Sequence, residues 1–213
     1  MRPVSDFFPR VLPYALGCPE PTLAQAIVDA AIAFCEDSMV LREPLDLIQT
    51  EAGVDHYDLD APPQQAVARV MDVYRDGVRL KSVLEDANRG TRTDRQSQPD
   101  SYRTTRAGSV FQLVLMPVPD RAYTVQVEAA MRPVRGATQL EDDLLDRWVE
   151  AVSAGAISRL TAMPGQPYTS METAAAYHAK AIWLANKARI EGSVGRMRGT
   201  QTVTPRPFVR GNP

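Results

Sequence analysis

The clearest hydrophobic pattern in the chain is a helical one that runs from residue 138 to residue 192. Its first half begins at Thr138, which has Glu141 three residues later, the spacing of a capping box at a helix N-terminus. Apolar side chains then recur every three or four residues, as they do along one face of a helix: Leu144, Leu145, Trp148, Val152, Ile157, Leu160 and Met163. The pattern predicts a helix that ends at the proline-rich turn of residues 164–167.

The second half of this stretch repeats the pattern after the turn. Thr169 and Glu172 again have capping-box spacing, and Gly192 is the expected C-terminal stop. The buried face of this second helix is marked by small and apolar residues: Tyr177, Ala181, Leu184, Ala185 and Ala188. Because Gly155 and the many alanines permit close approach, we expect two helices packed as an αα-hairpin.

The N-terminal part predicts one further helix. Residues 1–21 are rich in proline and aromatic side chains and show no regular period, so we expect an extended segment there. Thr22 and Gln25 have capping-box spacing and precede apolar positions on one helical face. The helix should end near Val40, since Pro44 disfavours helix in the residue before it.

Residues 44–135 have the alternating period of strands. Asp76-Gly77 is a strong hairpin signal between residues 66–74 and 78–83. Residues 110–116 and 123–131 flank a proline-containing turn, and we expect these two strands to face each other across it. Shorter strands are expected around residues 45–51, 54–59 and 102–106. Together they predict an antiparallel sheet or small sandwich with one side against the helices.

Two polar, arginine-rich segments lack any core pattern. Residues 91–101 contain no apolar side chain, and Arg92 and Arg95 there belong either to a solvated loop or to one that faces DNA or a tail component. The sequence TQTVTPRPFVRGN, residues 200–212, predicts an extended arm without a core of its own. Such an arm is either disordered or docked on another subunit, and its candidate docking residues are Val203, Pro205, Arg206, Phe208 and Val209.

These patterns together predict an α+β fold. A helical bundle would consist of the N-terminal helix and the C-terminal αα-hairpin, with an antiparallel β-sheet or small sandwich inserted between them. The bundle would take residues 1–43 and 136–192, the β-rich insertion residues 44–135, and the extended C-terminal arm residues 193–213.

Composition and charge exclude few function classes. The 213 residues are 44% hydrophobic and 23% charged, and the net charge of -2 provides no global attraction to nucleic acid or to an anionic membrane. Charge is uneven, with five acids against one arginine in residues 139–150 and six basic residues against Glu191 in residues 187–213. That polarity fits two ends that meet different partners, and it equally fits solvated surface. Only three of the 24 basic residues are lysine, which fits either bidentate arginine contacts or a GC-rich genome.

The sequence contains no recognisable catalytic or metal-binding constellation. His56 and His178 do not pair with a cysteine at a nucleophile spacing, and Cys18 and Cys35 have no metal or redox spacing. The acids of residues 141–143 are explained by the dipole of the helix that they begin. Walker, dinucleotide-binding and zinc motifs are absent. We therefore predict a structural protein rather than an enzyme, with no cofactor and no metal.

The sequence also bears on the cellular compartment in which the protein folds. There is no signal-peptide pattern at the N-terminus and no apolar run near the roughly 18 residues that a membrane span needs. We expect a protein that is made and folded in a reducing cytoplasm.

Several stretches together resemble a known family. They are residues 11–48 (VLPYALGCPEPTLAQAIVDAAIAFCEDSMVLREPLDLI) and residues 151–192 (AVSAGAISRLTAMPGQPYTSMETAAAYHAKAIWLANKARIEG). With Tyr57-Asp58-Leu59, residues 77–80 (GVRL) and residues 113–119 (LVLMPVP), they are similar to the head-to-tail adaptor (connector) proteins of tailed bacteriophages. The similarity covers nearly the whole chain in order, and the order of the motifs is more specific than any one of them.

The resemblance implies a homo-oligomeric ring, typically a dodecamer, that docks beneath the portal protein and links the capsid to the tail. The helices would surround the DNA channel, with Trp148, Arg159, Tyr177 and Trp183 as candidate ring-interface residues. The β-rich insertion would face a tail nozzle or tail-tube component, and the C-terminal arm would reach the portal or a neighbouring subunit. Contact with genomic double-stranded DNA would be transient and non-specific, and no membrane is involved. The expected location is the neck of the virion, at the portal vertex, after synthesis in the host bacterial cytoplasm.

Three alternatives remain open at this point. One is another neck or tail-completion protein of the same virion. The second is a DNA-binding accessory protein, which would rest on the arginine-rich loop and the basic C-terminus and would bind DNA with a steep salt dependence. The third is a small hydrolase that uses His56 or His178.

Overall fold

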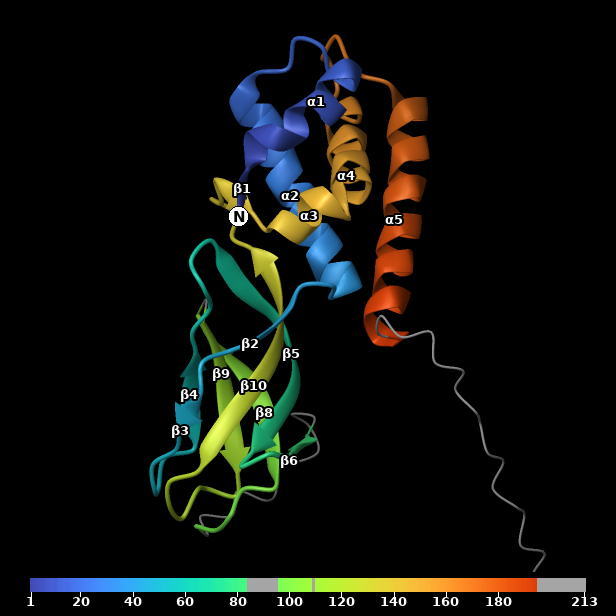
Figure 1. Ribbon diagram of the computed structural model, residues 1–213. Helices are drawn as coiled ribbons and strands as arrows, with labels where there is room; N and C mark the ends of the chain where they lie inside the picture. The colour runs from blue at the N-terminus through green and yellow to red at the C-terminus, as the bar shows by residue number, and fades with distance from the viewer. Residues whose placement is uncertain (84–95, 109, 195–213) are drawn as a thin grey trace, which may run out of the picture.

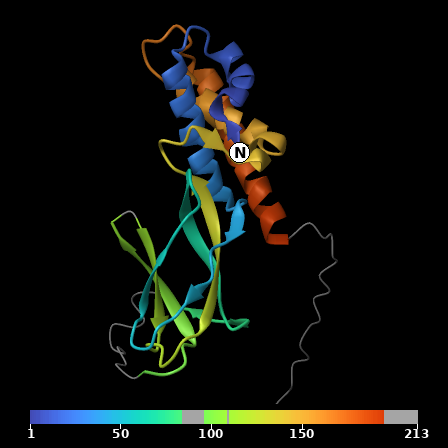
Figure 2. The ribbon, with the colours of Figure 1, turned by 60° about the vertical axis from the view of Figure 1, so that its left-hand side comes forward.

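The structure is a computed structural model that describes residues 1–83, 96–108 and 110–194. The helices gather at one end of an elongated molecule and the long strands at the other (Figure 1). The chain leaves the helical end after α2 (Glu20–Ser38), forms the strands, and returns to the helices after β10 (Thr124–Pro133). The same division is seen in the turned view (Figure 2).

The fold is richer in sheet than the sequence pattern predicted, so the expected helical bundle with a small inserted sheet is wrong. Among the described residues there are five helices, while strands take 30% and form three sheets that include a curled half-barrel. The largest part of the sheet structure is a long pairing between β5 (Gln65–Arg75) and β10. The register of this pairing shifts after Glu128 and again after Ala130. Irregularities of this kind bend a strand and increase its twist, which curls the sheet.

Two sheets make up the strand-rich end. The five-stranded sheet has the order β2 (Arg42–Pro44), β10, β5 and β6 (Val78–Arg79), and β3 (Ile48–Gln49) pairs with the other part of β10. The four-stranded sheet has the order β4 (His56–Leu59), β9 (Val110–Met116), β8 (Ser101–Ala107) and β7 (Lys81–Ser82). The expected pairing of β9 with β10 is therefore wrong, because the connection after Met116 passes from one sheet to the other.

The predicted turn at Asp76-Gly77 forms, but the returning strand is shorter than the expected residues 78–83: only β6 pairs with β5, whereas β7 pairs with β8 in the other sheet. Asp76 and Gly77 both have positive φ, 46° and 80°, which is the backbone of a type I′ turn. Asp76 also accepts a hydrogen bond from the backbone N–H of Thr124 (3.1 Å), which fastens the turn to β10.

Three long segments make up the helical end: α2, α4 (Val149–Thr161) and α5 (Met171–Val194), which pack against one another (Figure 1). The αα-hairpin of α4 and α5 is present, but the predicted first helix is divided. A short α3 (Asp142–Asp146) precedes α4, and the chain turns at Trp148 so that its indole packs on Phe34. Residues 139–140 form β11, which pairs with β1 (Arg2–Pro3).

The N-terminal segment is folded rather than extended. Short 3-10 helices at Val4–Phe7 and Leu12–Tyr14 flank α1 (Phe8–Val11), and the side chains of Phe7 and Val11 are fully buried. Proline lies at the first or second position of α1 and of the second 3-10 helix, where its missing N–H has no intrahelical partner to lose. The prolines therefore begin these turns instead of preventing them.

The predicted capping boxes do not form. α2 begins at Glu20, α3 at Asp142 and α5 at Met171. The side chains of Gln25 and Glu141 make other hydrogen bonds instead of capping a helix. Gln25 donates a hydrogen bond to Asp29, and Glu141 accepts one from Gln65. At the start of α5 the hydroxyl of Ser170 accepts a hydrogen bond from the backbone N–H of Thr173 (3.3 Å). The N-cap of this helix is therefore Ser170, one residue after the predicted Thr169.

Candidate functional site

The site is built where α2, α4 and α5 meet, and its floor depends on one glycine. Gly155 of α4 lies against Ala30 of α2, where a Cβ on Gly155 would come within 3.0 Å of the Ala30 Cβ. The two helices can therefore approach closely at this point. The carbonyl oxygen of Gly155 also accepts a hydrogen bond from Nη1 of Arg159 (3.3 Å), one turn further along α4.

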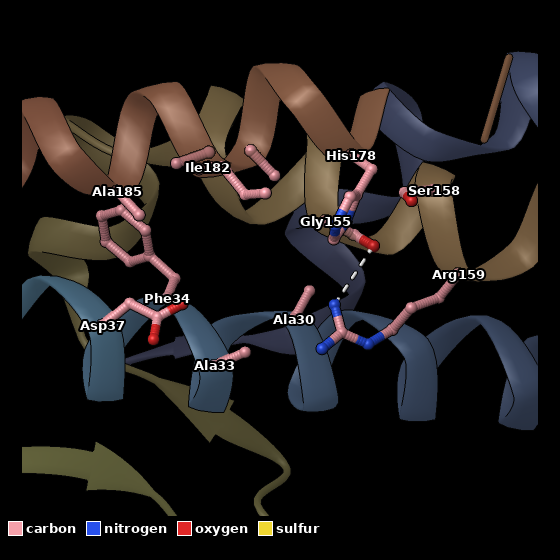
Figure 3. A pocket seen from close by; sticks show the side chains of 12 residues that line it. Ala30, Ala33, Phe34, Asp37, Gly155, Ser158, Arg159, His178, Ile182 and Ala185 are labelled. Carbon is pink, nitrogen blue, oxygen red and sulfur yellow. Dashed lines mark hydrogen bonds between the residues drawn. The ribbon is translucent and has the colours of Figure 1, made fainter. Parts of the chain in front are cut away.

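A groove opens between α2 and α5 above this floor, with a volume of about 330 Å³ (Figure 3). This is the lower end of the range for small-molecule sites. Most of its lining is small or apolar, and the lining residues are Ala30, Ala33, Phe34, Asp37, Ala151, Gly155, Ser158, Arg159, His178, Ala181, Ile182 and Ala185. A surface of this character suits another apolar side chain better than a polar ligand.

Four polar side chains line the groove: Asp37, Ser158, Arg159 and His178. Asp37 lies beside the α5 turn of Ala185, and Arg159 lies toward the turn of His178 (Figure 3). Within the described part of the chain, neither Asp37 nor Arg159 belongs to an ion pair. Asp37 thus places a negative charge at the Ala185 end of the groove, whereas the guanidinium of Arg159 lies beside Ala30 at its floor (Figure 3).

A second surface covers the side of α5 that faces away from the other helices; we call it the α5 outer face. Trp183 is 62% exposed and Ile190 61% exposed, and they are seven residues apart, so they lie on the same side of the helix. Exposed Ala176 and Ala179 continue this side. The opposite side of α5 packs Leu184 and Ala188 into the core. α5 therefore presents large apolar side chains on its outer side as well as to the core, and the outer side also carries Lys187, whose Nζ lies 5.9 Å from the centroid of the Trp183 ring.

The four candidate interface residues occupy four different environments. Trp183 lies on the α5 outer face, and Arg159 lines the groove. Trp148 is 5% exposed and packs on Phe34, with ring centroids 5.6 Å apart. The ring of Tyr177 meets that of Tyr14 edge-on at 5.0 Å, and the hydrogen bond between their hydroxyls, with burial, raises the pKa of Tyr177 to about 12.

The remaining predicted site residues lie outside the described residues. These are Arg92 and Arg95 of the polar loop, and Val203, Pro205, Arg206, Phe208 and Val209 of the arm.

The sequence reasoning missed the groove and the partners of Trp183 on the α5 outer face. The sequence does contain the signal for this face, because the spacing of Ala176, Ala179, Trp183 and Ile190 is that of a second helical stripe on α5. The groove had no comparable signal, because its walls come from three helices whose packing no local pattern specifies.

The two histidines lie at opposite ends of the molecule. His56 is on β4 and contacts the carboxylate of Asp55 through Nδ1, whereas His178 is on α5 in the groove. Cys35 is fully buried, and this burial raises the pKa of its thiol. A search of the described residues finds no group of three or more histidine, cysteine or acidic side chains placed to hold a metal ion. The same residues include no helix long and apolar enough to span a membrane.

A scan against known protein-family models finds no match, and a search of curated proteins finds no significant match.

Proposed function

We propose that the chain is a virion structural protein, a head-to-tail adaptor of a tailed bacteriophage. In this proposal copies of the chain assemble into a ring, typically of twelve, that docks beneath the portal protein and joins the capsid to the tail. The ring forms part of the channel for double-stranded DNA and performs no catalysis. Its location is the neck of the virion, and its further partner is a tail nozzle or tail-tube component.

The observation that carries this proposal is the pair of exposed apolar side chains, Trp183 and Ile190, on the α5 outer face. Large exposed apolar side chains that share one side of a helix mark a site of interaction with another protein. Trp183 at its centre is of the residue type most enriched among the strongest contributors to protein interfaces. Because this face lies on the opposite side of α5 from the core, a protein that covers it would pack against α5 without disturbing the fold.

The far end of the strands supports a second docking surface in the same proposal. Val78 in the β5–β6 hairpin is 55% exposed, and Leu47 between β2 and β3 is 61% exposed. Both segments lie toward the end of the molecule that points away from the helices (Figure 1). A subunit with apolar contacts at this end and along α5 could bind its own copies side by side and another virion protein end to end.

Electron microscopy of particles from a phage that lacks this gene tests the proposal. We expect heads without tails, or heads that have lost their DNA through an unsealed portal vertex, and we expect a plasmid copy of the gene to restore complete particles. Complete, infectious virions from the deletion would overturn the proposal. Phage that remains viable with His56 and His178 both replaced by alanine would separately dismiss a histidine-dependent hydrolase.

A further inference from the structure

We infer that copies of the chain join edge to edge through the four-stranded sheet, with β4 of one copy added as a strand beside β8 of the next. β4 lies at the left of the strand-rich end in Figure 1 and β8 to the right of it. The inference rests on the proposed function, because it specifies a contact by which neighbouring subunits of the ring would be joined.

The first of these edges is the outer side of β4. The backbone N–H of Leu115 donates to the carbonyl oxygen of Asp55 (2.9 Å), so alternate residues of β4 bond to β9. The backbone groups of His56 and Asp58 therefore face away from β9. Among the described residues no backbone group pairs with them, and both side chains are exposed. This edge is open to a further strand.

The opposite edge of the same sheet is open along most of β8. β7 pairs only with Ser101 and Tyr102, and the N–H of Val83 donates to the carbonyl oxygen of Tyr102 (2.9 Å). Because alternate residues of a strand face the same way, the backbone groups of Thr104 and Arg106 point to the side of β7 but lie beyond its end. In the described part of the chain these groups have no backbone partner, and both residues are exposed.

The two edges carry opposite charges. Residues 55–60 contain three aspartates and no lysine or arginine, whereas residues 103–107 contain two arginines and no acid. Within the residues that the structure describes, neither Asp58 nor Arg103 belongs to an ion pair. The Nε atom of Arg103 is buried and has no hydrogen-bond partner among the same residues. The charges of each edge are therefore available to the other.

Like charges oppose the pairing of either edge with its own copy. Charged side chains on an edge strand normally prevent it from adding to another sheet. Two β4 edges would bring aspartates together, and two β8 edges would bring arginines together, whereas contact between the two different edges joins opposite charges. Such a contact is heterologous, and its repetition produces a closed ring when the rotation closes.

The directions and faces of the two strands also fit a ring. β4 and β8 are both antiparallel to β9, so they run in the same direction, and rotation about an axis along the strands preserves that direction. Asp58 lies opposite Gln112 and Arg103 opposite Val114, so both side chains project from the same face of the sheet. When Asp58 of one copy bonds to Thr104 of the next, Arg103 lies opposite Asp58 or two residues from it. Both positions are within reach of a long side chain.

Site-specific crosslinking of the full chain tests this inference. One variant carries His56→Cys on β4 and the other Thr105→Cys on β8, and neither change removes an aspartate or arginine of the two edges. With a short bis-maleimide, we expect covalent dimers when the variants are mixed and at least about ten-fold less product from either alone. Glu20→Cys, at an exposed residue of the helical end, replaces Thr105→Cys in the matched control and should give equally little. The wild-type chain measures any background from the buried Cys18 and Cys35.

Charge reversal in the same two variants tests the cause of the contact. Asp58→Arg in the β4 variant should lower the yield of mixed dimer by at least about ten-fold, and so should Arg103→Asp in the β8 variant. The two reversed variants mixed together should restore the yield. Glu20→Arg in the β4 variant makes the same change of charge elsewhere and should leave the yield unaltered. An unchanged yield after either reversal, or no restoration from two reversed variants that circular dichroism shows to be folded, would overturn the inference.

Other occupants of the two edges give different results. A β4 variant that crosslinks to itself as well as it does to the β8 variant would indicate a two-fold contact and would overturn the inference. A Thr105→Cys thiol that reacts slowly with a small maleimide in the dilute monomer would show that the chain itself covers this edge, and would also overturn it.

The remaining outcomes distinguish this inference from the proposed function. No mixed product at any concentration, from a chain whose gene deletion still yields tailless heads, overturns the edge contact and leaves the adaptor role standing. Mixed product that responds to charge reversal, from a chain whose gene deletion leaves complete virions, supports the edge contact and overturns the adaptor role.

Discussion

Gly155 lies so close to Ala30 that a Cβ at position 155 would be 3.0 Å from the Ala30 Cβ. Ala30 is itself on α2 and 3% exposed, so it cannot move unless the helix moves with it. The close approach of α2 and α4, and with it the floor of the groove, therefore depends on the absence of a side chain at residue 155.

The first prediction follows from this contact. Gly155→Val should lower the free energy of unfolding by about 1–3 kcal/mol, the usual cost of forcing extra volume into a packed site. Gly192→Ala is the matched control, because its nearest neighbour would be Arg42 Nη2 at 3.7 Å, an ordinary contact. That change in a helix should stabilise by up to about 1 kcal/mol. Urea denaturation of both variants measures the difference, and equal effects would show that the α2–α4 contact tolerates a side chain.

Buried leucines in two helices provide the second prediction. Leu144 of α3 is fully buried and Leu184 of α5 is 6% exposed. Leu144→Ala and Leu184→Ala should each lower the free energy of unfolding by about 2–5 kcal/mol, since each would leave a cavity in the core. Leu16→Ala, at a residue that is 72% exposed, should change it by less than about 0.5 kcal/mol. Thermal shifts near zero for both buried positions would mean that these helix faces are not packed as described.

The sequence predicted those elements whose signal is local. α5 and its packed face follow from a 3.6-residue period, and the β5–β6 hairpin follows from Asp76-Gly77, whose positive φ angles few other residue pairs accept. The proline-rich composition of residues 1–21 predicts an extended segment, but proline at the first helical positions of α1 favours helix instead.

Local sequence patterns could not predict which strands pair with each other or where the candidate site lies. The alternation of β9 and β10 shows that each strand has a buried side, but it contains no information about which strand lies next to it. The two strands belong to different sheets, so proximity in sequence was misleading. The groove depends on the relative position of Phe34, Gly155 and Ile182 from three helices, which only the packed structure shows.

The third prediction concerns alkaline pH. The pKa of Tyr177 in the folded chain is raised from 10.0 to about 12, chiefly by its hydrogen bond with Tyr14. The folded state therefore holds this proton more tightly than the unfolded state, so the contribution to stability is complete below about pH 10 and is lost as pH rises toward 12. Tyr14→Phe keeps the edge-on ring contact and removes the hydroxyl. NMR titration of ring-labelled tyrosine should then show Tyr177 ionising at lower pH than in the wild type, and an unchanged titration would contradict the assigned cause.

The fourth prediction separates assembly from folding. Trp183→Asp places a charge at the centre of the α5 outer face, where the wild-type side chain is 62% exposed. The free energy of unfolding of the monomer should change by no more than about 0.5 kcal/mol. Self-association should weaken by at least about 30-fold, because a central tryptophan commonly contributes 2 kcal/mol or more to an interface. Analytical ultracentrifugation measures the association, Trp183→Phe is the control that keeps an aromatic ring, and full association of the aspartate variant would rule out this face as the interface.

The fifth prediction concerns the C-terminal residues, which lie outside the described part of the chain. Deletion of residues 200–213 should leave a folded, soluble monomer that no longer binds the portal protein, because the sequence there has no core pattern but carries Val203, Phe208 and Arg206 as docking candidates. Circular dichroism checks the fold, and co-sedimentation with purified portal rings checks binding. A chain in which residues 200–213 are replaced by an equal length of glycine and serine distinguishes loss of the specific side chains from loss of length. If the deleted chain still co-sediments with the portal, the arm is not the portal contact, and the helical end of the molecule becomes the surface to mutate next.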